Sequence, residues 1–330
     1  MRPPITTPLY ADAVTWSVIG GLALSCVLLS QGLGFSLSPA HAVLPALGVA
    51  ALVGALVIGR VRADARLVAG ATSFLQMTLF TILGVVLAYL MAAASGPLWD
   101  GWLTGVDERL GFDWPAILAV ADELPRPILL IAGVAYHSLV LQMVACVLVL
   151  AGTGRLERLQ RTMAAAILAG GVTVLVSGLL PATGNLFDPD RYRQLWTSVA
   201  WRDHGLVLGL RDGSIRQLDL SHMTGIVSFP SYHAALAAIL LWGLYPLTQL
   251  RVPAAIWAGL TILATPLFGG HYAVDVLAGL LLAIVALSVA RGLATAASDR
   301  DGMRRRGRRA TEAVRMSRLG GRMHGVEVIR

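Results

Sequence analysis

Long apolar stretches recur along almost the whole of this chain. Uninterrupted apolar runs of about 17 to 25 residues have the length that an α-helix needs to cross a bilayer. Such runs occupy residues 14–34, 42–59, 69–94, 127–151, 162–180, 230–250, 253–269 and 272–293. Of the 330 residues 56% are hydrophobic and only 14% are charged, which excludes an ordinary soluble globular protein. We therefore expect an all-α, polytopic transmembrane helical bundle of about eight helices.

The first apolar run has a second interpretation. Ala40-His41-Ala42 follows it and resembles the small-residue cleavage site of a signal peptide. The run is about 20 residues long, however, and the leader before it contains the acidic Asp12, which fits a retained helix better. We expect a retained helix, with cleavage as the alternative.

Arginines in the short connections orient the predicted helices. They lie within residues 60–66, within 155–161 and at 251, and lysine is absent from the whole chain. Because short loops rich in basic residues stay in the cytoplasm, these connections should face the cytoplasm and the longer loops 96–126 and 181–229 the outside. The alanine-rich, lysine-free composition is typical of a GC-rich bacterial genome, so we expect a multi-pass protein of the bacterial inner membrane.

The C-terminal segment carries the net charge of the chain. Residues 1–290 balance to zero, so the net charge of +7 belongs to residues 291–330. A basic segment directly after a hydrophobic one favours a cytoplasmic tail that faces anionic lipid over a tail that binds nucleic acid. We expect residues 294–330 to form this tail, to be disordered, and to bind no nucleic acid. A structural membrane protein that acts through its tail is one alternative function.

Two motifs place ionisable residues at the start of apolar helices. Phe229-Pro230-Ser231-Tyr232-His233 opens the sixth predicted helix, and Gly269-Gly270-His271-Tyr272-Ala273-Val274-Asp275 opens the eighth. Both starts fall on the outer side in the topology above. A proline and a serine in the first turn mark a helix N-terminus, where unpaired N–H groups and the helix dipole favour an anion. The motifs therefore predict an anion site between two histidines at the outer membrane face.

The residue types at this site suit phosphoryl transfer. His271 and Asp275 are four residues apart and so lie on one face of a helix. An aspartate that holds one imidazole nitrogen leaves the other free as a nucleophile toward phosphorus. His233 would then protonate the leaving oxygen and deprotonate the incoming water or alcohol. An ionisable residue such as Asp275 inside an apolar helix is costly and is usually functional.

Other groups should bind the phosphate oxygens. We expect Ser231, the backbone at Gly270 and at least one arginine to do so. Arg211 is our first choice of arginine, with Arg216, Arg193 and Arg126 in reserve. No further carboxylate or thiolate lies beside the histidines in the sequence, so we expect neither a metal nor another cofactor.

These motifs resemble those of the type 2 phosphatidic acid phosphatase superfamily of membrane phosphoesterases. Residues 230–233 are similar to its proline-serine-x-histidine motif, and residues 271–275 to the end of its third motif. The resemblance implies that His271 is the nucleophile, Asp275 its partner and His233 the acid and base. It also implies a six-helix catalytic core within residues 69–293, with two additional transmembrane helices in residues 1–68.

The chain departs from the family pattern in its cations. The first motif requires a lysine, which this chain lacks, and Thr265 replaces the arginine expected six residues before His271. A divergent branch that includes inositol phosphorylceramide synthases also lacks the standard first motif. Resemblance to this branch lies in residues 107–114, Tyr136 with Ser138 and Gln142, residues 181–184, residues 211–213 and residues 228–231. The substrate implied is a lipid phosphate of phosphatidic acid, isoprenoid phosphate or phosphoinositol type. Water and a small alcohol such as inositol both stay open as acceptors.

The loop 181–229 should form a small lid over the site. Residues 190–202 mix aromatic side chains with arginines, as a helix at the headgroup level does. Apolar runs on both sides of Arg211-Asp212-Gly213-Ser214 predict a β-hairpin. The remaining alternative function is a non-enzymatic transporter with a His/Asp proton relay. It is disfavoured because the polar residues gather at one face instead of at several depths.

Overall fold

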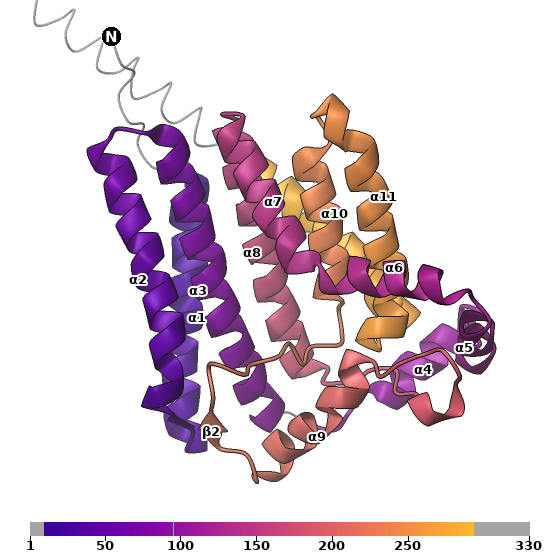
Figure 1. The fold of residues 1–330 in the computed structure, drawn as a ribbon. Coiled ribbons are helices and arrows are strands. Elements are labelled where there is room, and N and C mark those ends of the chain that lie inside the picture. The colour runs from indigo at the N-terminus through magenta and orange to yellow at the C-terminus, as the bar shows by residue number, and fades with distance from the viewer. Residues whose placement is uncertain (1–9, 95, 294–330) are drawn as a thin grey trace, which may run out of the picture.

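Long, nearly parallel helices form the body of the molecule (Figure 1). The structure, a computed structural model, describes residues 10–94 and 96–293. Within them six helices are long and apolar enough to cross a membrane. These are α1 (Tyr10–Leu33), α2 (Pro39–Val61), α3 (Ala65–Ala94), α8 (Leu156–Leu179), α11 (Thr248–Ala264), which continues into the π-turn η2 (Thr265–Gly269), and the last helix, Ala273–Leu293. The all-α transmembrane bundle is confirmed, and the chain is a multi-pass membrane protein. The predicted tail 294–330 lies outside the described residues.

Two of the eight predicted spans differ from a straight transmembrane helix. The fourth is divided at Ser138 into α6 (Arg126–His137) and α7 (Leu139–Gly152), which are bent by 59°, and it brings the number of spans to seven if counted as one. The sixth, α10 (Tyr232–Leu244), has only 13 residues, or about 20 Å, against the roughly 30 Å of a bilayer core. It ends just before Pro246, which has no N–H to continue the helix, and Arg158 Nε donates to the carbonyl of Gly243 at 2.8 Å.

Helices α3 and α8 form the centre of the bundle. Residues 164–166 of α8 are alanines that are almost entirely buried. At Gly170 an added Cβ would lie 2.3 Å from Cζ of Phe80, so only glycine lets the two helices approach this closely. Helix α1 packs against both α3 and α8, whereas α2 packs on α3 and stays largely exposed.

The longer segments between the long helices gather at one end of the bundle (Figure 1). They include α4 (Asp100–Arg109), α5 (Trp114–Asp122), the short 3-10 turn η1 (Pro189–Arg191) and α9 (Val199–Asp212). The expected helix over 190–202 is wrong, because helical structure resumes only at Val199, where Ser198 Oγ accepts from the N–H of Trp201.

The expected hairpin around residues 211–214 is also wrong. Residues 206–210 are helical, and Gly213, with φ of 89°, ends α9, because a left-handed glycine terminates a helix as readily as it turns a hairpin. The following strand, β2 (Gln217–Leu218), pairs in parallel with β1 (Ser36–Leu37), which connects α1 to α2.

Aspartates of the segment between α3 and α6 hold the other segments at this end of the bundle in place. Asp107 is fully buried, and its carboxylate accepts from the N–H groups of Ala273 at 2.7 Å and Val274 at 2.9 Å. Asp100 accepts from the N–H groups of residues 183 and 184, both at 3.0 Å. Asp122 accepts from those of residues 193–195. These carboxylates thus cap the last helix and fasten the 181–229 segment.

Loss of the Asp107 cap should destabilise the last helix. The change Asp107→Ala leaves two helix N–H groups without their acceptor, at a cost of about 2 kcal/mol. We expect a clearly lower thermal unfolding temperature in detergent. The neighbouring Glu108→Gln, which alters an exposed carboxylate on the same helix, is the matched control and should unfold like the wild type. Equal stability of all three proteins would contradict the capping role.

Asp122 should make stability depend on acid pH. Its pKa is lowered, first by the N–H of Arg193 and then by those of residues 194 and 195. The carboxylate therefore contributes stability above the ordinary aspartate pKa of about 3.9, and the contribution is lost as pH falls through the lower folded-state pKa. Thermal unfolding of wild type and Asp122→Asn across this range tests the point. The wild type should lose more of its unfolding temperature on acidification than the variant does.

Candidate active site

The starts of α10 and of the last helix lie against each other. The N–H of Ser231 donates to the carbonyl of Asp275 at 2.9 Å. A Cβ at Gly279 would lie 2.2 Å from the carbonyl oxygen of Ser231, so this contact requires glycine on the last helix. The two sequence motifs therefore meet at the end of the bundle that carries α4, α5 and α9.

A buried carboxylate orients His271. Asp275 is 0% exposed, and its Oδ2 lies 3.2 Å from Nδ1 of His271. The same oxygen accepts from Ser228 Oγ at 2.8 Å and from the N–H of Tyr272 at 3.0 Å. Because a carboxylate only accepts, Nδ1 carries the proton and Nε2 is left with its lone pair. Sequence reasoning did not assign this role to Ser228, although its place three residues before Ser231 is a usable signal.

The second histidine faces the first. The ring centroids of His233 and His271 are 6.4 Å apart, with an angle of 54° between the planes. Reacting atoms approach to about 3 to 3.5 Å before bonds change, so a phosphoryl group fits between the two rings. Tyr136 stacks on the other face of the site, with its ring 4.5 Å from that of His233 and nearly parallel to it.

Both histidines line a cavity of about 620 Å³. The cavity is bounded by α3, the bent pair α6–α7, α8, α9, α10 and the segment before α10. Its polar lining includes Tyr136, His137, Arg202, Asp203, His233, His271, Ser228 and several threonines, and its apolar lining includes Met77, Ile82, Val85, Leu139, Val140 and Leu236. The cavity thus suits a molecule with a polar head and an apolar chain.

The bend between α6 and α7 directs Tyr136 and His137 toward this cavity. Three side-chain donors converge on the carbonyl of Ala135: Ser138 Oγ, Gln142 Nε2 and Thr261 Oγ1, each at 3.0 Å. A carbonyl that binds side chains in place of the next helical turn is a common cause of a sharp kink. The bend is therefore held by polar contacts within the bundle.

Two of the predicted phosphate-binding groups lie close to the histidines. Ser231 is fully buried, and its Oγ accepts from the N–H of Ala234, so it caps α10. Gly270 lines the cavity and has φ of 74°. A Cβ there would lie 2.5 Å from that of Ala200 on α9. The structure thus brings His271, His233, Asp275, Ser231 and Gly270 together.

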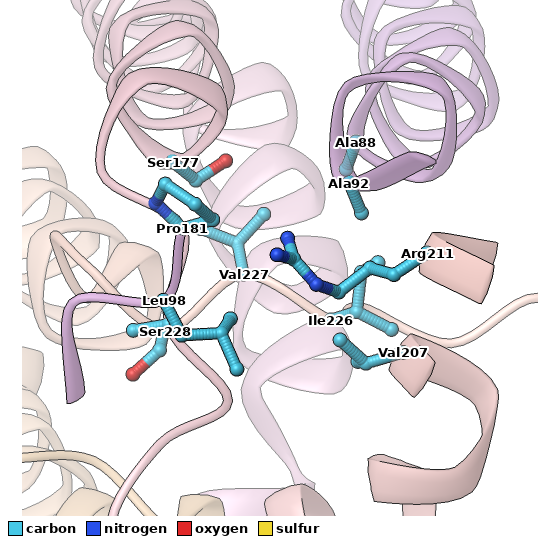
Figure 2. Close-up of a pocket in the computed structure, with 11 residues that line it drawn as sticks. Ala88, Ala92, Leu98, Ser177, Pro181, Val207, Arg211, Ile226, Val227 and Ser228 are labelled. Carbon is cyan, nitrogen blue, oxygen red and sulfur yellow. The ribbon is translucent and has the colours of Figure 1, made fainter. Parts of the chain in front are cut away.

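Arg211 lies elsewhere. Its guanidinium donates to the carbonyl of Gly96 at 2.6 Å. It lines a separate, much smaller cavity, where Figure 2 shows it pointing between Ala92 of α3 and Val227. This small cavity adjoins the large one, because Ser228 lines both. The reserve arginines are also removed from the histidines: Arg216 donates to the carbonyl of Leu210, Arg193 pairs with Glu123, and Arg126 is exposed at the start of α6.

The arginine that does line the large cavity is Arg202. Its Nε and one terminal nitrogen donate to the two carboxylate oxygens of Asp203, at 2.9 and 3.1 Å. This hydrogen bonding, more than any other contact, raises the pKa of Arg202. Sequence reasoning missed its position because it placed Arg202 in a helix at the headgroup level. The signal was Ser198, a helix N-cap that starts α9 and directs the next turn toward the site.

The described part of the chain contains no group of three or more His, Cys, Asp or Glu side chains arranged to hold a metal ion. The two thiols, Cys26 and Cys146, are both buried and unpaired with each other.

The comparison with protein-family models identifies the chain. The model of the PAP2 superfamily matches residues 101–289, more than half of the chain. The matched region includes α10 and the first turns of the last helix, and it leaves out α1, α2 and α3. Neither the comparison with curated proteins nor that with solved structures gave a match. Members of this superfamily act as phosphatases or phosphotransferases on lipid phosphates, and the protein described here belongs to the PAP2 superfamily.

Proposed function

We propose that this protein is a membrane enzyme that cleaves or transfers the phosphate group of a lipid through a phospho-histidine intermediate on His271. One observation carries the proposal. The buried carboxylate of Asp275 holds Nδ1 of His271, and the His271 ring lies 6.4 Å from that of His233 in a cavity that both histidines line. Family membership supports the same reaction class.

The reaction proceeds in two displacements. In the first, Nε2 of His271 attacks phosphorus, the bond from phosphorus to the lipid oxygen breaks, and His233 gives its proton to that oxygen. In the second, water or an alcohol attacks phosphorus, His233 takes the proton of the attacking hydroxyl, and the bond from phosphorus to His271 breaks. Asp275 stabilises the positive charge that His271 gains on phosphorylation.

Arg202 is the group we propose for phosphate binding, in place of the cations that the family motifs would supply. Thr265, at the position of the expected arginine, is fully buried and donates to the carbonyl of Thr261. Arg202 lines the cavity and donates two of its five N–H groups to Asp203. Its remaining N–H groups can therefore bind phosphate oxygens. The N–H groups of Tyr232 and His233, in the first turn of α10, are suited to bind the same oxygens.

The substrate we propose is a lipid phosphate whose hydrocarbon chain follows the apolar wall of the cavity. Much of this wall is formed by α3, which is long enough to span the membrane, and by α7, the second half of the bent pair. Phosphatidic acid, an isoprenoid phosphate and a phosphoinositide all combine such a chain with a phosphate. Transfer to a small alcohol such as inositol is a second candidate reaction, because His271 is only 5% exposed and a site that limits water favours another acceptor.

We place the site at the outer face of the bacterial inner membrane. Arg155 and Arg158 lie at the start of α8, and that helix ends next to the segment that contacts the site. Because arginine-rich connections stay in the cytoplasm, the histidines would lie on the opposite side and the C-terminal tail in the cytoplasm.

The first test follows both products at once. Purified protein in detergent is incubated with lipid phosphates, lipid pyrophosphates and phosphoinositides, with and without inositol and with a chelator present throughout. Released phosphate that is absent from His271→Ala would establish a hydrolase, and new phosphodiester lipid with little free phosphate a transferase. If neither wild type nor variant releases phosphate or forms new lipid from any substrate of the panel, the proposal is contradicted. A non-enzymatic transporter that uses the His/Asp relay is then favoured.

Replacing Arg202 and Arg211 separately by alanine tests which of the two binds the phosphate. We expect Arg202→Ala to lower kcat/KM about 10- to 100-fold, as loss of a charged hydrogen bond does, and Arg211→Ala to lower it less than about 3-fold. The double change Arg202→Ala, Asp203→Ala removes the carboxylate that the single variant leaves unpaired and should stay impaired. The reverse ranking of the single variants would restore Arg211 as the cation.

A further inference from the structure

The ring of Tyr136 stacks on His233 and also lies beside Gly269, in the turn that leads to His271. Tyr136 is 3% exposed and stacks on His233, with ring centroids 4.5 Å apart and 13° between the planes. A Cβ at Gly269 would lie 2.9 Å from Oη of Tyr136 and 2.7 Å from Cδ2 of His271. The tyrosine therefore occupies the space between the imidazole of His233 and the turn that precedes His271.

The surroundings leave this ring little freedom. Tyr136 packs in a buried cluster with Ala264 and Phe268. It also precedes the bend of α6–α7 by two residues, and that bend is held by the donors on the carbonyl of Ala135. Because its backbone and its packing neighbours both fix the ring of Tyr136, that ring can hold the imidazole of His233 that stacks on it.

We propose that Tyr136 is a positioning residue that fixes the imidazole plane of His233 for proton transfer to the leaving oxygen. The inference rests on the acid and base role proposed for His233. Stacking prevents rotation of the imidazole out of the plane in which one nitrogen points into the cavity. Without the stacked ring, His233 keeps its chemistry but spends less time in the productive orientation.

If Tyr136 positions His233, the effect of losing the tyrosine should depend on the leaving group of the substrate. In the first displacement the bond from phosphorus to the leaving oxygen breaks while His233 gives that oxygen a proton. An alkoxide needs this proton, because it is a strong base. A nitrophenolate leaves without it, because its negative charge is delocalised over the ring. Misplacement of His233 should therefore slow an alkyl phosphate far more than a nitrophenyl phosphate.

The experiment uses two synthetic phosphates with the same hydrocarbon chain, one an alkyl ester and one a nitrophenyl ester. We measure kcat/KM, which covers the first displacement, for wild type, Tyr136→Leu, Tyr136→Phe and His233→Ala. We expect Tyr136→Leu to lose about 10- to 100-fold on the alkyl ester, a part of the usual contribution of general acid catalysis. On the nitrophenyl ester we expect a loss below about 3-fold. Tyr136→Phe keeps the stacked ring and should behave as the wild type.

A matched control separates positioning from general damage. Tyr192→Leu truncates a tyrosine in a different cluster, edge-on to Phe187 and away from the cavity. It should lower activity toward both esters equally or not at all. Gel filtration and thermal unfolding check that each variant is folded.

The outcomes also separate this inference from the proposed function. If His233→Ala shows the difference between the esters and Tyr136→Leu loses activity equally on both, the positioning role is wrong. If Tyr136→Phe is as impaired as Tyr136→Leu, the hydroxyl and not the stacked ring matters, and the proposal is again wrong. If His233→Ala itself shows no difference between the esters, the acid role of His233 fails and the proposed mechanism with it.

Discussion

Aspartate carboxylates that accept several hydrogen bonds are the interaction on which the end of the bundle with α4, α5 and α9 depends. An ionised carboxylate removed from water is costly unless its oxygens are hydrogen-bonded. The buried Asp107 and Asp122 meet this requirement with N–H groups distant in sequence, and the half-buried Asp100 accepts from residues 183 and 184. Asp275 accepts three hydrogen bonds on Oδ2 alone. Each aspartate therefore ties a loop or a helix start to the bundle. The orientation of His271 is one result, because its helix is capped by Asp107 and its ring is held by Asp275.

The transmembrane helices could be predicted from sequence because a bilayer demands length and apolar character together. The pairing of His271 with Asp275 could be predicted as well, since a spacing of four residues is a local property of a helix. Sequence reasoning placed the loop 96–126 on the outer side and gave the aspartates within it no partners. Their partners lie up to about 170 positions away, and a pattern within one segment does not indicate such partners.

The remaining errors share this physical origin. The hairpin expected at residues 211–214 became a helix end, because Gly213 suits both structures and the neighbouring β1 supplied the partner strand. Arg211 was chosen for its nearness in sequence to the second motif, yet Arg202 lines the cavity. The N-cap Ser198 fixes where α9 starts, and this start places the side chain of Arg202 on the side of the helix that lines the cavity. The bend at Ser138 is held by the local Ser138 and Gln142 and also by Thr261, a residue of another helix that a local pattern does not indicate.

The pairing of β1 with β2 links the two N-terminal helices to the region that the family model matches. Helices α1 and α2 lie outside the region matched by the family model, and the strand between them is bonded to residues 216–218. His41 of α2 also lies 3.0 Å from the carboxylate of Asp219, a few residues before the segment that lines the cavity. The strand between these two helices and His41 are therefore attached to the segment that leads into the lining of the cavity. A chimera that replaced the two helices would have to rebuild that attachment.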